Sequence, residues 1–260
     1  MTSASQRIDA LDTSLFTKVL SQTSEQERQT LLAVQRSVAR RYGKYTYLEI
    51  GSYLGGSLQP HVADSRCTKI FSIDPRPDCP PDDRVPGTGI EYAGNTKQRM
   101  LDGLATIDPQ GAAKIVCLDA DAKDISPSLI FPPPHIAFID GEHTHAAALS
   151  DFTFCNQVVH KDGVILFHDF GVIHTALHRI CQTLNREHKR HLPIRLDGSI
   201  FGIFFDPSII MSDPYLTDVN RRYGHLWNRY ILKHHLRKFV PEWVFDSLQR
   251  LRRPGAAMSL

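Results

Sequence analysis

The chain has 260 residues, of which 42% are hydrophobic, so it is long enough to bury the core of one domain. With 30 basic and 28 acidic residues its net charge is close to zero, which gives no reason to expect a nucleic-acid partner. No apolar run approaches the ~18 residues of a membrane span, the N-terminus lacks the apolar segment of a signal peptide, and five cysteines show no metal or disulfide spacing. We therefore expect a cytoplasmic protein with reduced thiols.

In chain order, the first predicted helix begins at a capping box. In Ser24-Glu-Gln-Glu27, the serine and the second glutamate can each accept a hydrogen bond from the other's backbone N–H. Apolar residues at helical spacing continue toward Gly43, where the helix should end. We expect residues 1–43 to form a helical cover over the domain that follows.

Short apolar runs alternate with helices over residues 44–206, which we predict to be the main domain. The predicted strands are 45–50, 68–74, 113–118, 135–139, 163–167 and 199–205. Helices are expected after Ser57 and over 96–106, 146–159 and 175–187, whereas the proline-rich segment 75–94 should be a loop. This alternation favours an α/β fold with a Rossmann-like, doubly wound, mostly parallel sheet.

A glycine-rich turn follows the first predicted strand. Its pattern is Glu49-x-Gly51-x-x-x-Gly55, which is neither the dinucleotide fingerprint nor a phosphate-binding loop. Asp74 closes the next strand, at a position where an acid can bind two ribose hydroxyls. The alternatives are a tight turn for the glycines and a helix-capping role for Asp74.

Acidic and imidazole groups directly follow two later strands. Phe138-Ile-Asp-Gly-Glu-His143 ends one strand, and Val164-Ile-Leu-Phe-His-Asp169 ends another. Both runs read as buried parallel strands, and ligands of open α/β sheets bind beyond the carboxyl ends of the strands. The sequence therefore predicts a reaction site at this edge of the sheet.

These motifs together resemble a known superfamily. Glu49-x-Gly51-x-x-x-Gly55, Asp74 and Ala120-Asp-Ala122 resemble the cofactor motifs of class I S-adenosylmethionine-dependent methyltransferases. Ile139-Asp-Gly-x-His143 and Gly163-x-x-x-x-His-Asp169 resemble the small-molecule and sugar O-methyltransferase group, which includes macrocin O-methyltransferase-like and cephalosporin-hydroxylase-like proteins. The resemblance implies a seven-stranded sheet with helices on both faces.

The resemblance also implies a cofactor site for S-adenosylmethionine. Glu49 and Gly51 would lie near the methionine moiety, Asp74 at the ribose, and Asp121 with Ala122 at the adenine. The residues implied to bind the cofactor are Glu49, Gly51, Ser52, Gly55, Ser57, Asp74, Asp121, Ala122 and Asp140.

A divalent cation, Mg²⁺ or Mn²⁺, is implied beside the cofactor, with Asp140, His168 and Asp169 as its ligands. An alcohol is a poor nucleophile until it loses its proton, and a bound cation acidifies it. Asp140 and His143 are the implied catalytic residues, with His143 as the base, because histidine titrates near neutrality. His168 departs from an all-carboxylate pattern and suits softer ions than Mg²⁺, so a structural role for His168 stays open.

We expect S-adenosylmethionine-dependent O-methylation of a small molecule, such as a sugar of a glycan precursor or of a glycosylated natural product. One alternative is a metal-independent methyltransferase that uses His143 as base; another is a degenerate methyltransferase fold that binds a partner. A nicotinamide oxidoreductase is disfavoured, because the glycine spacing differs and no Tyr-x-x-x-Lys accompanies the site.

The last part of the chain, residues 207–260, is predicted to be a basic helical extension. Residues 221–260 contain nine Lys and Arg but only two acidic residues, Glu242 and Asp246, so this segment is strongly basic. One apolar helical face runs through Val219, Tyr223, Leu226, Trp227, Tyr230 and Ile231. This face can pack on its own domain or on a second copy in a homo-oligomer, or it can contact a membrane surface or an anionic glycolipid.

Overall fold

The computed structural model describes residues 2–85 and 87–237, with side chains described through residue 224 and for Trp227. Seven strands form one sheet at its centre. The strand order is β3-β2-β1-β4-β5-β7-β6, with β7 antiparallel to β5 and β6 and the other neighbours parallel. The strands are β1 Tyr45–Ile50, β2 Cys67–Ile73, β3 Ile115–Leu118, β4 Ile136–Ile139, β5 Val164–Phe167, β6 Leu192–Arg195 and β7 Phe201–Phe204. The predicted Rossmann-like α/β fold is confirmed.

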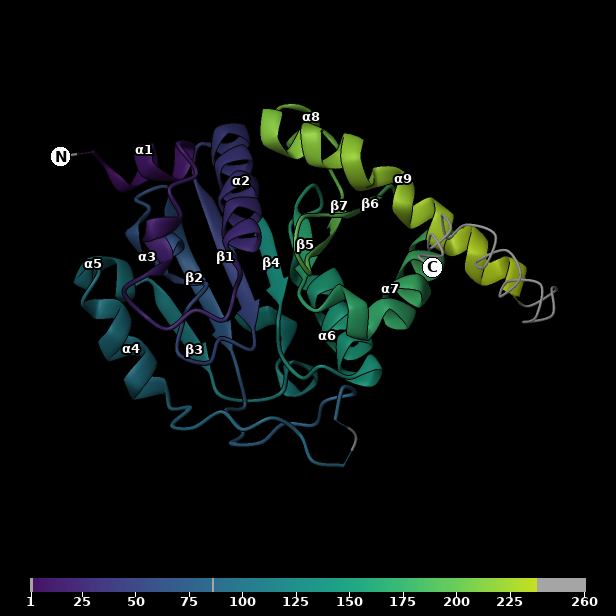
Figure 1. Ribbon diagram of the computed structural model, residues 1–260. Coiled ribbons are helices and arrows are strands. Elements are labelled where there is room, and N and C mark those ends of the chain that lie inside the picture. Colours follow the sequence, from purple (N-terminus) through teal and green to yellow (C-terminus); the bar gives the residue numbers. More distant parts are fainter. Residues whose placement is uncertain (1, 86, 238–260) are drawn as a thin grey trace, which may run out of the picture.

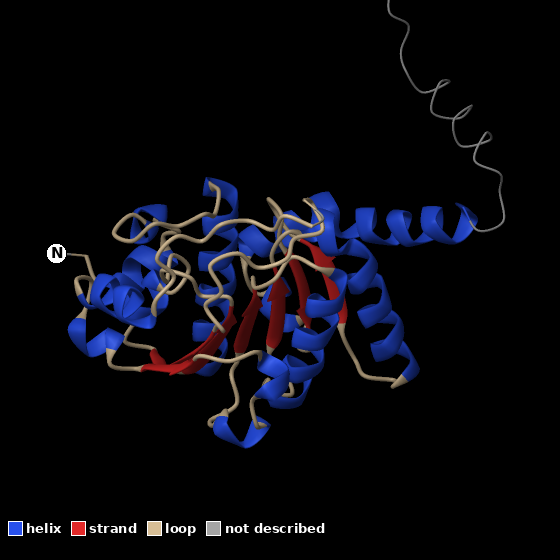
Figure 2. Ribbon diagram, turned by 90° about the horizontal axis from the view of Figure 1, so that it is seen from below, coloured by secondary structure: helices blue, strands red, loops and turns tan. Residues whose placement is uncertain are grey.

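Helices cover both faces of the sheet (Figures 1 and 2). One face carries α1 Ala4–Asp9, η1 Thr13–Phe16, α2 Glu25–Tyr42, α3 Gln59–Ala63, α4 Lys97–Ala105, α5 Pro109–Ala112 and α8 Ser208–Met211. The other carries η2 Ala122–Asp124, η3 Pro127–Leu129, α6 His145–Val158 and α7 Phe170–Arg186. The last helix, α9 Pro214–Arg237, contacts β6 at the edge of the sheet.

The two cores follow from the alternation of side chains along each strand. In β1, Tyr45 and Tyr47 belong to the core beneath α2, whereas Leu48 and Ile50 belong to the core beneath α6. Every residue of β1 is buried, as expected for a central parallel strand with helices on both faces. Glu49 therefore lies on the same face as Tyr47.

The predicted first helix is confirmed as α2. The Ser24 side chain accepts from the backbone N–H of Glu27, and the Glu27 carboxylate accepts from the backbone N–H of Ser24 at 2.7 Å. The helix ends at Gly43, whose φ of +74° is readily available to glycine.

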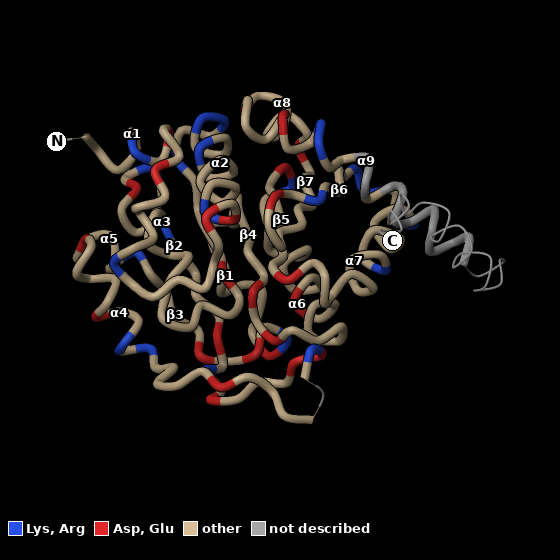
Figure 3. Tube along the Cα trace, viewed as in Figure 1, with Lys and Arg blue, Asp and Glu red and all other residues tan. Residues whose placement is uncertain are grey.

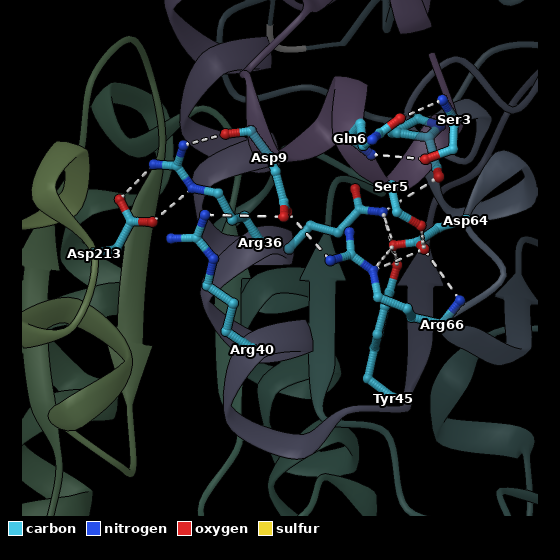
Figure 4. Close-up of polar contacts among 12 residues, drawn as sticks. Ser3, Ser5, Gln6, Asp9, Arg36, Arg40, Tyr45, Asp64, Arg66 and Asp213 are labelled. Atoms are coloured by element: carbon cyan, nitrogen blue, oxygen red, sulfur yellow. Dashed lines mark hydrogen bonds and ion pairs between the residues drawn. The ribbon is translucent and has the colours of Figure 1, made fainter. Parts of the chain in front are cut away.

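Buried ion pairs fasten the N-terminal helices to the rest of the chain (Figure 4). The Arg36 guanidinium of α2 donates to both oxygens of Asp213 at 2.7 and 2.8 Å and to the backbone carbonyl of Asp9 at 2.7 Å. Nearby, fully buried Asp64 accepts hydrogen bonds from Arg66 and from Tyr45 of β1. Because such buried charges are costly when unpaired, this network fixes the N-terminal segment against the sheet.

Several short elements had not been predicted, namely α1, α5, α8 and β6. Strand β6 contains Pro193, which cannot donate a ladder hydrogen bond, and proline fits here because β6 lies at the edge of the sheet. Helix α7 begins at Phe170 rather than at the predicted residue 175, because the left-handed backbone of Asp169 (φ +51°) turns the chain directly from β5 into the helix.

The beginning of the C-terminal extension packs on the domain itself. Val219 and Trp227 of α9 are buried, and the Trp227 ring lies 4.6 Å from that of Phe201 and 6.0 Å from that of Phe170, centroid to centroid. The predicted apolar face also includes Leu226, Tyr230 and Ile231, whose side chains lie outside the described part of the structure. The basic residues beyond 237 lie outside it as well. Of the helices that the structure describes, none combines the length and apolar character needed to cross a membrane.

Candidate functional site

A cavity of about 520 Å³ opens at the carboxyl ends of β1, β2 and β4. Acidic positions gather at this edge of the sheet (Figure 3), where the loop after β2 runs across the strand ends. Among its lining residues are five of those predicted to bind the cofactor: Gly51, Asp74, Asp121, Ala122 and Asp140.

Gly51 is required here for two reasons. Its φ is +85°, and a Cβ atom would lie only 2.3 Å from the carbonyl oxygen of Asp140. Glycine adopts this positive φ without strain, whereas other residues rarely do. The close contact arises because β1 and β4 are neighbouring strands that end side by side. Any larger residue would push the end of β1 away from the end of β4.

Asp74 faces the cavity at the end of β2. Its two carboxylate oxygens accept one backbone hydrogen bond each, from Tyr53 at 2.9 Å and from Arg76 at 2.7 Å. These bonds fix the orientation of the carboxylate and leave each oxygen with capacity for a further donor. A pair of ribose hydroxyls would supply such donors.

The other four predicted cofactor residues do not line the cavity. Glu49 points to the α2 face, where it accepts from Tyr47 at 2.5 Å and from Ser57 at 2.6 Å. Burial raises the pKa of Glu49 to about 8, assisted by the charges of Asp140 and Asp74. Ser52 accepts a hydrogen bond from Ser72, and Gly55 allows α4 to approach, since a Cβ there would lie 2.7 Å from Leu104.

Beside the cavity, Asp140, His143, His168 and Asp169 form one cluster, with ligand atoms that all lie within 4.8 Å of one another. Nε2 of His143 lies 3.0 Å from Oδ2 of Asp169 and 3.6 Å from Oδ1 of Asp140. Nδ1 of His168 lies 3.1 Å from the same Asp140 oxygen. The adjacent parallel strands β4 and β5 therefore bring together the four residues that the sequence placed at this edge.

Each imidazole of the cluster has a further carboxylate on its outer side. Nδ1 of His143 lies 2.9 Å from Asp82, in the loop after β2, and Nε2 of His168 lies 3.4 Å from Glu27 of α2. The sequence indicates a capping-box role for Glu27 and no role for Asp82. No local pattern indicates that either residue belongs to the site, because both reach it through tertiary packing.

Arg84 and its neighbours hold the loop after β2 against the cluster. The Arg84 guanidinium lies 3.2 Å from Asp169 and 2.6 Å from Asp82. The backbone N–H of Asp83 donates to the carbonyl of His143 at 3.1 Å, and the Asp83 carboxylate lies 2.8 Å from Nδ1 of His145. The loop thus covers the site through both backbone and side-chain contacts.

The charges of the cluster are strongly coupled. Burial opposes ionisation of Asp140, yet the positive charge of His168 and the hydrogen bond from His143 lower the pKa of Asp140 to about 2. Burial likewise disfavours protonated His168, but Asp140, Asp169 and Glu27 outweigh it and raise the pKa of His168 far above its usual range. Without a bound cation, His168 is therefore a positively charged partner of these acids.

The donor set fits a divalent cation. Nε2 of His143 is buried and has no hydrogen-bond partner among the described residues, because its close contact with Asp169 lacks hydrogen-bond geometry. Metal-binding histidines commonly direct their second ring nitrogen to a carboxylate, as His143 does toward Asp82 and His168 toward Glu27. The imidazole of His168 and two carboxylates can thus converge on one ion, with Nε2 of His143 beside them.

Two comparisons with known proteins match part of the chain. Residues 48–170 match a family model described as a methyltransferase domain. An uncharacterized protein of Acanthamoeba polyphaga mimivirus is 29% identical over 127 residues, which are 48% of this chain and 51% of that protein. The chain thus spans about half the length of this curated relative.

Solved structures share the fold at low sequence identity. A calicheamicin methyltransferase, CalS11, aligns with a TM-score of 0.52 and 14% identity over 77% of this chain and 91% of its own. The O-methyltransferase NovP aligns with a TM-score of 0.51 and 15% identity over 67% of this chain and 78% of its own.

Proposed function

We propose that this chain, whose residues 48–170 match a methyltransferase domain, is a class I S-adenosylmethionine-dependent methyltransferase that methylates a hydroxyl group of a small molecule. The observation that carries the proposal is the position of Asp140, which both lines the cavity and belongs to the four-residue cluster. A cofactor in the cavity and an acceptor at the cluster would therefore meet at Asp140.

When bound, S-adenosylmethionine would supply the methyl group, whose carbon would form a C–O bond with the acceptor oxygen as the C–S bond breaks. The proton of the hydroxyl passes to Nε2 of His143, which faces the cluster. Nδ1 of His143 lies 2.9 Å from Asp82 and 2.8 Å from the Arg84 guanidinium, and in the tautomer whose Nδ1 donates to Asp82 its Nε2 is free to accept a proton. Arg84 in turn keeps Asp82 ionised, since its hydrogen bonds hold the pKa of Asp82 at about 2.

Asp140, His168 and Asp169 would hold a divalent cation, which leaves Nε2 of His143 free to accept the proton. When bound, such a cation would acidify the acceptor hydroxyl. Imidazole ligands favour Mn²⁺ over Mg²⁺, which prefers oxygen ligands. The second candidate mechanism is metal-free, with protonated His168, held between Asp140 and Glu27, supplying the positive charge.

The proposed acceptor is a sugar hydroxyl, either on a glycan precursor or on a glycosylated natural product. The sugar is taken from the resemblance of Ile139-Asp-Gly-x-His143 and Gly163-x-x-x-x-His-Asp169 to sugar O-methyltransferases. Two proteins of similar fold, a calicheamicin methyltransferase and an O-methyltransferase, support methylation of an oxygen. The acceptor would lie beneath the loop after β2, whose residues Asp82 and Arg84 contact the cluster.

Transfer of a labelled methyl group tests the proposal. Purified protein is incubated with labelled S-adenosylmethionine and a panel of glycosylated and phenolic acceptors, in chelator and after addition of Mn²⁺ or Mg²⁺. We expect transfer to a glycosylated acceptor that chelator abolishes and Mn²⁺ restores better than Mg²⁺. Full transfer in chelator would establish the metal-free mechanism, and no labelled product from any acceptor would contradict hydroxyl methylation.

A matched pair of variants assigns the activity to the cluster. Asp140→Asn should lose transfer, because the amide cannot carry the charge that balances His168. Asp78→Asn removes an exposed acid of the loop after β2 and should leave transfer unchanged.

A further inference from the structure

One end of the cavity holds a buried carboxylate without a partner. Asp151 of α6 lines the cavity and is only 9% exposed, and no described residue donates a hydrogen bond to it. Burial raises the pKa of Asp151 to about 7, assisted by the charges of Asp121 and Glu142. Because a desolvated acceptor without a donor is unfavourable, this carboxylate is expected to receive one from a ligand.

The surroundings of Asp151 fit a flat, uncharged ring. Helix η2 packs against α6, and the cavity between them is lined by the short side chains of Ala122, Ala147 and Ser150. Gly141 lies beside the Asp151 carboxylate, since a Cβ atom on Gly141 would lie 3.6 Å from Oδ2 of Asp151. These short side chains leave space in the cavity for a ring next to Asp151.

The charge at this end selects against phosphate. Asp121, Glu142 and Asp151 all line it, whereas Lys123 is the one cation among the described lining residues and is paired with Asp121 at 3.1 Å. Three acids against one lysine leave this part of the cavity with a net negative charge, which attracts groups that donate hydrogen bonds and repels anions. A neutral ring that bears an amino group matches this environment.

The order of groups in the proposed cofactor places its purine here. The sulfonium must lie near Asp140 and the cluster for methyl transfer, and Asp74 offers its free acceptor positions to the ribose. The ribose separates the sulfonium from the base, so the purine would occupy a further part of the same cavity. Ala122 and Asp151 are among the residues that line this cavity.

We propose that the Asp151 side chain accepts a hydrogen bond from the exocyclic amino group of the cofactor's purine and so selects adenine. The inference rests on the proposed function, because it assumes that S-adenosylmethionine occupies the cavity. Asp151 is then a specificity-determining residue that lies on α6, outside the strand-end motifs.

The test compares two ligands in calorimetric titrations: S-adenosylhomocysteine and its 6-deamino analogue, in which hydrogen replaces the amino group. Wild type should bind the parent about 10- to 100-fold more tightly, because the analogue leaves a buried acceptor unpaired. Asp151→Ala should bind both ligands with nearly equal affinity. Asp151→Asn retains an acceptor oxygen and should keep most of the preference.

Asp124→Ala is the matched control, since it removes an exposed acid of η2 that does not line the cavity. Thermal unfolding of each variant verifies that it is folded. The inference is overturned if Asp151→Ala keeps the wild-type preference for the amino group, even where both ligands bind more weakly. If wild type binds neither ligand, the proposed cofactor itself is wrong, which is a separate outcome.

Discussion

Replacing Glu27 by alanine should damage both the stability and the activity of this protein, because one carboxylate serves the fold and the site. Glu27 is 5% exposed, and its oxygens accept from the backbone N–H groups of Ser24 and Ser199, both at 2.7 Å. The same carboxylate lies 3.4 Å from Nε2 of His168. Among the ion pairs of the described residues, no other residue of the first 43 contacts the cluster.

The expected loss of stability follows from the groups left without a partner. The N–H of Ser199 and the imidazolium of His168 would each lose a buried acceptor, at about 1–3 kcal/mol per group. The sum is roughly 2–6 kcal/mol, or on the order of 5–20 °C in melting temperature for a domain of this size. Glu27→Gln keeps one acceptor oxygen and should fall between wild type and Glu27→Ala.

Two assays separate the structural and positioning roles of Glu27. Thermal unfolding gives the stability loss, with Glu25→Ala as control, since Glu25 is exposed in the first turn of the same helix. Methyl transfer, measured well below the melting temperature of the variant, should fall about 10- to 100-fold in Glu27→Gln while cofactor binding is unchanged. A Glu27→Ala protein that melts within about 2 °C of wild type and transfers at the wild-type rate would refute this reasoning.

Three further predictions concern separate parts of the molecule. Asp151→Asn should stabilise the ligand-free protein increasingly as pH rises from 4 to 8. Folding raises the pKa of Asp151 from 3.8 to about 7, so the unfolding free energy of wild type falls by up to roughly 4 kcal/mol over that range, whereas the amide does not titrate. A difference in unfolding free energy between the two proteins that does not change with pH would count against this. Gly51→Ala should abolish cofactor binding in calorimetry, because its Cβ would lie 2.3 Å from the Asp140 carbonyl; retained binding would show that β1 and β4 can separate at little cost. Trp227→Ala should lower the unfolding free energy by about 3–5 kcal/mol in denaturant titration if α9 is part of the domain, whereas an unchanged midpoint would mean that α9 contributes little.

The central sheet and four residues of the site were predictable because each depends on local sequence. Buried parallel strands are short apolar runs, and their carboxyl ends meet at one edge, so Asp140 and Asp169 had to be neighbours. The position of Asp74 in the cavity followed in the same way from the end of β2.

The remaining parts of the site depend on packing that no local pattern encodes. Glu27 reaches His168 only because α2 lies across the sheet face, and Asp82 reaches His143 only because the proline-rich loop folds back over β4. Glu49 lies away from the cavity because the alternation of β1 points it toward Tyr47 and α2. Asp151 lies on α6, outside the strand-end motifs, and lines the cavity only through the packing of that helix.

The most direct measurement is a crystal structure of the protein grown with S-adenosylhomocysteine and Mn²⁺, with anomalous data at the manganese edge. We predict ribose density at Asp74, the sulfur beside Asp140, and an anomalous peak between Asp140, His168 and Asp169. A nucleoside bound elsewhere, or with its sulfur far from Asp140, would contradict the account. A correctly placed nucleoside without an anomalous peak would instead leave the cofactor assignment intact and exclude the metal site.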